Sequence, residues 1–244
     1  MDRLIYTSMS GAKFLLERQA TLANNLANAT TTGFRADTVG LRAVPAVSPQ
    51  AGTRVFTVET TTGADFSQGP LTATGRTLDV AIQGQGWLAV QTGDGSEAYT
   101  RDGALQVGPD GVVQLANGLQ VQGTSGPISI PADAQTILIA ADGTVTVKGA
   151  SSLVPTTVGQ LKLVNPPTSD LVKGSDGLFR TQGGEPAEAD PSVKVADGTL
   201  EGSNVNVVEA MVGMIAASRQ FELQMRMLST AEQNEQKASS VVGV

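Results

Sequence analysis

One stretch decides how this chain is expected to fold: Ala23-Asn24-Asn25-Leu26-Ala27-Asn28-Ala29-Thr30-Thr31-Thr32-Gly33-Phe34. Asn and Thr side chains compete with a helix for backbone hydrogen bonds, and Gly33 suits a helix end, so the stretch closes an N-terminal helix. A second long helical pattern begins only near Asn206, so two helices bracket a middle rich in glycine and strand-forming residues. Because the stretch contains no catalytic group, it favours a protein that assembles over one that catalyses a reaction.

The N-terminal helix is predicted over residues 3–28. Side chains that are apolar, apart from Gln19, recur along it with alternating spacings of four and three, which places them on one face. This stripe consists of Ile5, Met9, Ala12, Leu16, Gln19, Ala23 and Leu26, and Leu4, Leu15 and Leu22 widen it. Two interpretations stay open, a coiled coil and an amphipathic helix that lies on a globular core.

The composition excludes several classes of function. The 244 residues are 40% hydrophobic but only 4% aromatic, so the core must be built mainly from aliphatic side chains. Residues 43–200 carry eight basic and fifteen acidic groups, whereas nucleic acids and anionic membranes bind basic surfaces. The chain has no cysteine and no histidine, which excludes disulfides, Cys/His zinc sites and Ser-His-Asp triads.

Nothing in the sequence predicts insertion into a membrane. No apolar run approaches the roughly 18 residues that a spanning helix needs. Near the start, Leu4-Ile5-Tyr6 is the only compact apolar cluster, and the charged residues Lys13, Glu17 and Arg18 interrupt the apolar pattern after it. We therefore expect no cleavable secretory signal.

The middle of the chain is predicted to be a mostly antiparallel β domain. Residues 35–75 contain three prolines and a Thr-rich run, which fit extended strands or a protruding hairpin. From Leu78 to about Val147 the pattern is a meander of short strands. Its Asp-Gly and Asn-Gly pairs favour tight hairpin turns, and they lie at Asp94-Gly95, Asp102-Gly103, Asp110-Gly111, Asn117-Gly118 and Asp142-Gly143.

The C-terminal helix is predicted to begin at Asn206, with Glu209 three residues later as in a capping box, and to run to about Ser239. Its apolar side chains lie on two opposed faces. One face holds Met211, Met214, Phe221, Met225 and Leu228, and the other holds Val205, Val208, Val212, Ala216, Leu223 and Met227. A helix that lies on one domain needs a single apolar face, so two faces favour an assembly of several helices over burial within one domain.

Three motifs could indicate chemistry. Gly84-Gln85-Gly86-Trp87-Leu88-Ala89 loosely matches a dinucleotide fingerprint, but a strand and a turn come after it where that fingerprint requires a helix. The Asp-Gly pairs could suggest calcium, but their spacing of eight residues favours turns. A pair of carboxylates for glycoside chemistry remains a background alternative, because nothing in the sequence marks such a pair.

Four stretches carry a resemblance to a known family. Asn24-Asn25-Leu26-Ala27-Asn28 followed by Thr31-Thr32-Gly33-Phe34-Arg35 resembles the signature of flagellar rod and hook proteins, the axial proteins of the bacterial flagellum. The other three are Leu78-Asp79-Val80-Ala81-Ile82-Gln83-Gly84-Gln85-Gly86-Trp87, Tyr99-Thr100-Arg101-Asp102-Gly103 and Leu200-Glu201-Gly202-Ser203-Asn204-Val205-Asn206. Together they sample the whole chain. Within the family, Met1–Thr7, Leu41–Pro45 and Trp87-Leu88 are most similar to a member from the proximal rod.

The resemblance implies a structural subunit of the basal-body rod that assembles axially and transmits torque for motility. Its terminal helices would pair as an inner coiled-coil core around a channel, with the β domain as an outer layer. Its partners would be other copies of itself, neighbouring rod proteins and the flagellar type III export apparatus. Its location would be the periplasm-spanning rod. A distal-rod or hook protein is the alternative within the family, and a secreted β-rich adhesin is the alternative outside it.

We therefore expect an α+β fold with four segments. These are an N-terminal core helix (1–34), an extended connector (35–75), a β-rich outer domain (76–199) and a C-terminal core helix (200–244). No catalytic, cofactor-binding or metal-ligating residue is predicted, and no small-molecule substrate. The candidate assembly residues are Ile5, Met9, Leu16, Asn24, Asn25, Leu26, Asn28, Gly33, Phe34, Met211, Met214, Phe221, Met225 and Leu228.

Overall fold

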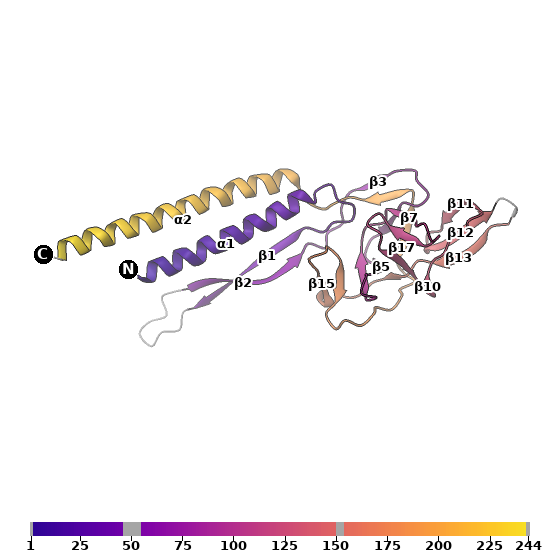
Figure 1. Cartoon of the computed structure of the whole chain (residues 1–244), viewed down its shortest axis with the longest axis horizontal. Coiled ribbons are helices and arrows are strands. Elements are labelled where there is room, and N and C mark those ends of the chain that lie inside the picture. The colour runs from indigo at the N-terminus through magenta and orange to yellow at the C-terminus, as the bar shows by residue number, and fades with distance from the viewer. Residues whose placement is uncertain (1, 46–54, 150–153, 243–244) are drawn as a thin grey trace. The chain divides into compact units, whose positions relative to one another are not determined.

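The fold combines two long helices with a β-rich middle, as expected (Figure 1). The computed structural model describes residues 2–45, 55–149 and 154–242. The chain divides into two compact units. The helical unit contains Met1–Ala29, Ala36–Asp65 and Val205–Val244, and the β unit contains Thr30–Arg35 and Phe66–Asn204. Within the described residues, no helix is long and apolar enough to cross a membrane.

The helical unit is built from helices α1 (Asp2–Ala27) and α2 (Val207–Val242). They lie side by side and run in opposite directions (Figure 1), because α1 near its start faces the middle of α2, and α1 near its end faces the start of α2. A Cβ atom on Gly11 would lie 3.2 Å from Gln224, and one on Gly213 would lie 3.2 Å from Leu22. Glycines at these two points let the helix backbones approach closely.

A β-hairpin completes the helical unit. Strand β1 (Asp37–Pro45) pairs antiparallel with β2 (Val55–Ala64), and both contact α1. The hairpin lies within the range 35–75, where the sequence predicted extended strands or a protruding hairpin. The prolines at 45 and 70 lie at its edge or beyond it, and Pro49 lies outside the described residues.

The buried stripe of α1 differs from the predicted one. Ser8, Ala12 and Leu15 are buried, whereas Met9 and Leu16 are 57% and 51% exposed. Ala12 belongs to the predicted stripe and Leu15 widens it, so this part of the prediction is confirmed. The packed face is shifted toward Ser8 and Leu15, and Met9 and Leu16 are thereby left on the surface.

The beginning of α2 agrees with the predicted cap. The side-chain oxygen of Asn206 accepts hydrogen bonds from the backbone N–H groups of Val208 (3.1 Å) and Glu209 (3.2 Å). These are two of the N–H groups that a helix start leaves without intrahelical partners. Asn206 therefore fixes where α2 begins.

Short strands form the β unit, and every pairing between its described strands is antiparallel. The strands are β3 (Leu71–Ala73), β4 (Val80–Gln83), β5 (Trp87–Gln91), β6 (Glu97–Thr100), β7 (Leu105–Val107), β8 (Val113–Leu115), β9 (Gln120–Gly123), β10 (Gly126–Pro127), β11 (Ala134–Ile139), β12 (Thr144–Gly149), β13 (Thr156–Gln160), β14 (Leu163–Val164), β15 (Leu171–Lys173), β16 (Phe179–Thr181), β17 (Lys194–Asp197) and β18 (Thr199–Glu201). A 3-10 helix, η1 (Thr168–Asp170), precedes β15.

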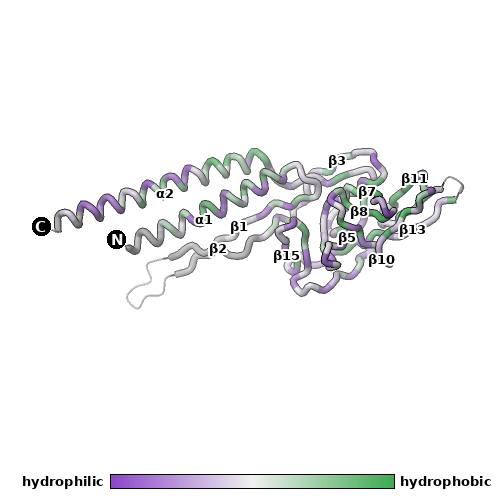
Figure 2. Tube along the Cα trace, viewed as in Figure 1, coloured by the Kyte–Doolittle hydropathy of each residue, from purple (hydrophilic) through white to green (hydrophobic). Residues whose placement is uncertain are grey.

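The largest sheet has the order β15-β16-β6-β5-β9-β8-β7, with β10 on β9 and β14 on β5. A three-stranded sheet, β11-β12-β13, and the pairs β17-β4 and β18-β3 complete the unit. The core is mainly aliphatic, as the composition predicted, and includes Val90, Leu105, Leu115, Val121 and Leu161. Figure 2 shows hydrophobic residues along the strands of the β unit.

Four of the five predicted turns form, at Asp94-Gly95, Asp110-Gly111, Asn117-Gly118 and Asp142-Gly143. The prediction was wrong for Asp102-Gly103, where no turn is present, because Gly103 instead lets the Val80 backbone approach closely. Gly95, Gly111 and Gly143 all have a positive φ, which the turn requires. The Asp94 carboxylate accepts hydrogen bonds from the Thr92 hydroxyl (2.5 Å) and the Ser96 N–H (3.0 Å), and these bonds lower the pKa of Asp94 to about 2. Among the described residues, no group of three or more Asp or Glu side chains is placed to hold a metal ion.

The Gly84-Gln85-Gly86 stretch is a bend between strands, which confirms the interpretation favoured over a dinucleotide site. Gly84 and Gly86 have positive φ values, and strand β5 follows immediately.

Candidate functional site

A buried carboxylate binds three separate parts of the β unit together. Glu201 is 0% exposed, and its Oε2 accepts a hydrogen bond from Nη1 of Arg101 at 3.0 Å. Its Oε1 accepts the backbone N–H of Gly69 at 3.0 Å and lies 2.6 Å from Nη2 of Arg35. We call Glu201, Arg35 and Arg101 the Glu201 cluster.

The local fold explains why these side chains meet. Glu201 ends strand β18, which pairs with β3, and Arg101 directly follows strand β6. The Arg101 guanidinium also donates to the carbonyl oxygens of Ile82 (3.3 Å) and Gly84 (2.5 Å) and lies 5.4 Å from the centre of the Trp87 ring. The four motifs that carry the family resemblance therefore converge on this cluster.

The Glu201 cluster holds two positive groups and one negative group in a dry interior. Burial lowers the pKa of Arg101, while the Glu201 charge raises it and the Arg35 charge lowers it again. Arg35 contacts the carboxylate as an ion pair without hydrogen-bond geometry. Its Nε and Nη1 atoms, and Nε of Arg101, have no hydrogen-bond partner within the described parts of the chain. Removing one partner from such a buried set typically costs about 3–5 kcal/mol.

The segment Thr30–Arg35 is anchored in the β unit. The Gly33 N–H donates to the Glu201 carbonyl oxygen (2.8 Å), and the Asn204 N–H donates to the Phe34 carbonyl oxygen (3.3 Å). Nζ of Lys173 donates to the Arg35 carbonyl oxygen (2.7 Å) and lies 4.0 Å from the centre of the Phe34 ring. The predicted sites Gly33 and Phe34 thus lie beyond α1, in contact with β-unit residues.

Asn25 joins α1 to the first strand of the hairpin. Its Nδ2 donates to the Asp37 carbonyl oxygen (2.9 Å), and its Oδ1 accepts the Asp37 N–H (2.7 Å). Asn25 is only 7% exposed. At the exposed surface of the helix end, Nδ2 of Asn28 donates to the side-chain oxygen of Asn24 (2.7 Å) and to its carbonyl oxygen (3.0 Å). The asparagines of the opening stretch therefore satisfy backbone and side-chain groups at the end of α1.

Replacing Asn25 with Ala is expected to detach the start of β1 from α1. Two partly buried hydrogen bonds are lost, each contributing about 1 kcal/mol, so the Asp37 amide should exchange its hydrogen roughly tenfold faster or more. Asn24→Ala is the matched control, because Asn24 is exposed. Hydrogen exchange of the peptide that contains Asp37 measures the effect, and equal rates in the two variants would contradict this role of Asn25.

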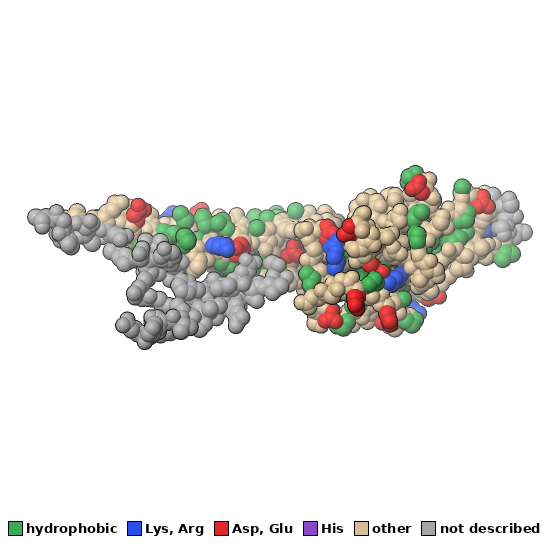
Figure 3. Space-filling view, turned by 60° about the horizontal axis from the view of Figure 1, so that its bottom comes forward, with side chains coloured by type: hydrophobic (Ala, Val, Ile, Leu, Met, Phe, Trp, Pro, Cys, Tyr) green, Lys and Arg blue, Asp and Glu red, His purple; other side chains and the backbone are tan. Residues whose placement is uncertain are grey.

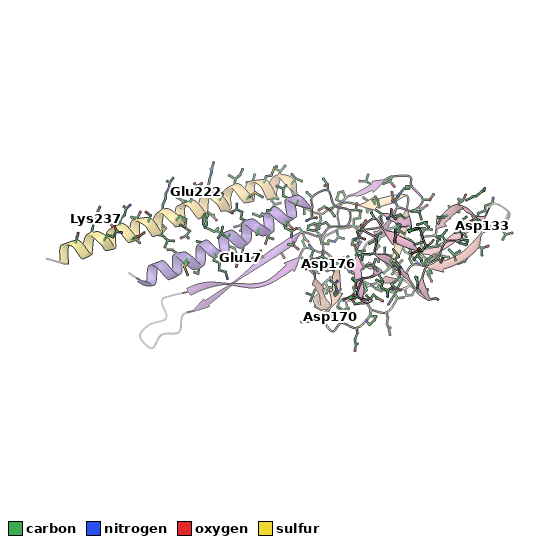
Figure 4. All side chains as sticks on the ribbon, in the orientation of Figure 1. Glu17, Asp133, Asp170, Asp176, Glu222 and Lys237 are labelled. Atoms are coloured by element: carbon green, nitrogen blue, oxygen red, sulfur yellow. The ribbon has the colours of Figure 1, made fainter. Side chains whose placement is uncertain are left out.

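The other predicted assembly residues lie on the helices. Leu26, Met214, Phe221 and Leu228 are half-buried, Met211 and Met225 are exposed along with Met9 and Leu16, and Ile5 lies in α1 with a side chain outside those described. Figure 3 shows apolar side chains gathered on the surface of the helical unit. Figure 4 places the charged residues Glu17 on α1 and Glu222 and Lys237 on α2.

Sequence reasoning missed the Glu201 cluster. Arg35, Arg101 and Glu201 each stood inside a motif that carried the resemblance, but none was named as a candidate. One feature of the sequence could have indicated these residues, because three of the four motifs contain a charged residue within two positions of a glycine.

Three family models match the chain. Residues 5–35 match "Flagella basal body rod protein", residues 81–147 match "Flagellar hook protein FlgE/F/G D1 domain", and residues 196–241 match "Flagellar basal body rod FlgEFG protein C-terminal". Each matched region contains one member of the Glu201 cluster.

Full-length relatives agree with these matches. The flagellar basal-body rod protein FlgF of Escherichia coli is 46% identical over 254 residues, and that of Salmonella typhimurium is 44% identical over 252 residues, each covering 100% of both chains. A flagellar basal-body rod protein FlgG from Buchnera aphidicola subsp. Baizongia pistaciae is 34% identical, over 89% of this chain and 91% of its own. The chain therefore belongs to the family of the flagellar basal-body rod protein FlgF.

Proposed function

We propose that this structural rod subunit acts in the proximal rod, assembles through the apolar surfaces of α1 and α2, and has no enzymatic activity. The observation that carries the proposal is the exposure of large apolar side chains on both helices. Val208, Val212, Ile215 and Leu223 of α2 are 70%, 61%, 57% and 59% exposed. Contiguous exposed apolar surface of this kind marks a protein interaction site.

The spacing of the buried side chains supports a coiled-coil pairing of the helices. On α2 most of the buried or half-buried positions follow spacings of four and three, as in a heptad repeat. These are Ala210, Met214, Ala217, Phe221, Gln224, Leu228 and Ala231, and the half-buried Gly213 and Ser218 lie beside this row. We propose that this pair is the inner-core element of the assembled rod.

A groove on the helical unit offers a place for a further helix. It has a volume of about 410 Å³, and its lining is largely apolar. The lining residues are Gly11, Phe14, Leu15, Gln220, Leu223, Gln224 and Met227. Because α1 and α2 leave this groove and the outer face of α2 uncovered within the described residues, both surfaces are available to neighbouring subunits.

The proposed partners are other copies of this chain, neighbouring rod proteins and the flagellar type III export apparatus. The proposed location is the part of the basal body that spans the periplasm. A distal-rod or hook role is the alternative within the family, since a second kind of basal-body rod protein, named FlgG, is also similar along most of the chain. The greater identity to the FlgF proteins of Escherichia coli and Salmonella typhimurium supports the proximal role.

Charging the outer face of α2 is expected to prevent rod assembly. Met211→Asp combined with Ile215→Asp places two carboxylates, one helical turn apart, on side chains that are 50% and 57% exposed. The monomer should still fold, because neither side chain is buried, but docking would have to desolvate both charges. A strain that carries only this variant should lose swimming, measured by motility in soft agar and by the presence of rods in isolated basal bodies.

The matched control is Ser229→Asp combined with Gln233→Asp. It adds the same two charges with the same spacing at exposed polar positions of α2. We expect this strain to swim. Normal rods in the Met211/Ile215 strain would overturn the proposed assembly surface.

A further inference from the structure

The partners that hold the segment Thr30–Arg35 lie far downstream in the chain. Lys173 donates to a carbonyl oxygen of the segment at 2.7 Å, across 138 positions. Glu201 accepts an N–H of the segment at 2.8 Å and forms the ion pair with its last residue, and Asn204 donates to another of its carbonyl oxygens. The full set of contacts therefore forms only when residues 201–204 are in place.

The charges of the cluster make this dependence strict. The Arg35 side chain is 0% exposed and that of Arg101 is 5% exposed, and Glu201 is the carboxylate that contacts both. Before Glu201 docks, closing the segment would bury two like charges with no counter-charge between them. Burial of uncompensated charge is among the largest penalties in a protein interior, so the open arrangement is favoured until the carboxylate arrives.

We propose that Glu201 is an electrostatic latch: the like charges of Arg35 and Arg101 keep Thr30–Arg35 from closing onto the β unit until strand β18 has docked and brought the Glu201 carboxylate between them. The segment that follows α1 in the chain is then fixed in the same event as the segment that precedes α2. A chain whose β unit is incomplete cannot fix either one. The latch goes beyond the proposed function and is independent of it, because it concerns contacts within the β unit of a single chain.

The test is hydrogen exchange on the full-length purified chain. Glu201→Gln keeps the size of the side chain, but it removes the counter-charge and replaces one of the two acceptor oxygens with an NH2 group. We expect the backbone amides of residues 30–36 and of Gly69 to exchange at least about tenfold faster. Loss of a buried ion pair can produce a larger increase in the exchange rate than this. Strand β5 should exchange at its original rate. Equal acceleration in β5, or no acceleration in residues 30–36, would overturn the latch.

Glu209→Gln is the matched control, because Glu209 is an exposed glutamate of α2 and its substitution removes the same charge. It should leave residues 30–36 unchanged.

A second arm tests whether repulsion is the cause. In an Arg35→Met background a single arginine remains, so Glu201→Gln should accelerate exchange of residues 30–36 by less than about threefold relative to Arg35→Met alone. The same acceleration in both backgrounds would show that charge balance is not responsible.

A third arm uses the unaltered chain, so it decides the question even if the glutamine variant does not fold. In pulse-labelled refolding, residues 30–36 should gain protection in the same phase as residues 199–204 and after strand β5. Protection of residues 30–36 before residues 199–204 would overturn the proposed order. Because none of these measurements requires a rod, failure of the latch and failure of the proposed function can be told apart.

Discussion

Gly33→Ala is expected to lower the free energy of unfolding of the β unit by about 2–5 kcal/mol. Gly33 has a φ of +67°, a left-handed conformation that side chains make unfavourable. A Cβ atom at this position would also run into the backbone of Arg101 and Asp102. Because the obstacle is backbone, no side-chain rotation can relieve the clash, and the Gly33–Glu201 hydrogen bond would be displaced with it.

The matched control for this substitution is Gly75→Ala. Gly75 lies in the same unit with a φ of +72°, but a Cβ there would meet no atom within 4 Å, so only the backbone strain of about 1–2 kcal/mol applies. Denaturant unfolding followed by fluorescence reports on the β unit alone, since Trp87 is the one tryptophan of the chain. Equal losses in the two variants would mean that the contact of Gly33 with the Arg101 backbone does not matter.

The helices show how far periodicity can predict structure. Spacings of three and four predicted both helices, and Asn206 was predicted as the cap that the structure shows. The packed face of α1 was predicted only in part, since Ala12 and Leu15 are buried as predicted, whereas Met9 and Leu16 are exposed and Ser8 is buried. Hydrophobic periodicity does not decide which of two neighbouring rows of side chains faces a partner helix, and Ser8 gives no hydrophobic signal. The distance between helices is a tertiary property that one sequence does not contain.

The Glu201 cluster shows where sequence reasoning ends. Charged side chains are normally exposed, so nothing local indicated that Arg35, Arg101 and Glu201 would be buried. Arg101 and Glu201 are separated by 100 positions, and they meet only through the tertiary fold of the β unit. Gly33 could be predicted as a special position because the conformational freedom of glycine is a local property. Its close contact with the Arg101 backbone could not be predicted, because that contact depends on the tertiary fold.

The contacts of Gly33, Phe34 and Arg35 make Thr30–Arg35 part of the β unit, although this segment follows α1 in the chain. The helix predicted over residues 3–28 agrees with α1, which ends at Ala27. The four-segment division stays a prediction for the assembled protein. For an isolated chain, the boundaries of the two compact units predict which residues fold together.

A fragment of residues 30–204 is expected to unfold at a temperature roughly 6–12 °C higher than a fragment of residues 36–204. The shorter fragment lacks the hydrogen bonds that Gly33, Phe34 and Arg35 make with Glu201, Asn204 and Lys173. At about 1 kcal/mol each, their loss amounts to roughly 3 kcal/mol, and each kcal/mol shifts the melting temperature of a domain of this size by about 2–4 °C.

Both fragments lack the helices and retain the β1–β2 hairpin, so the comparison isolates six residues at the N-terminus. The difference cannot come from a stranded carboxylate, because Glu201 keeps its hydrogen bond to Arg101 in the shorter fragment. Scanning calorimetry of the two fragments measures it, and Gly33→Ala in the longer fragment should remove much of the advantage. Identical melting temperatures would mean that Thr30–Arg35 adds no stability to the β unit. The opening stretch would then end in a linker that does not anchor the chain.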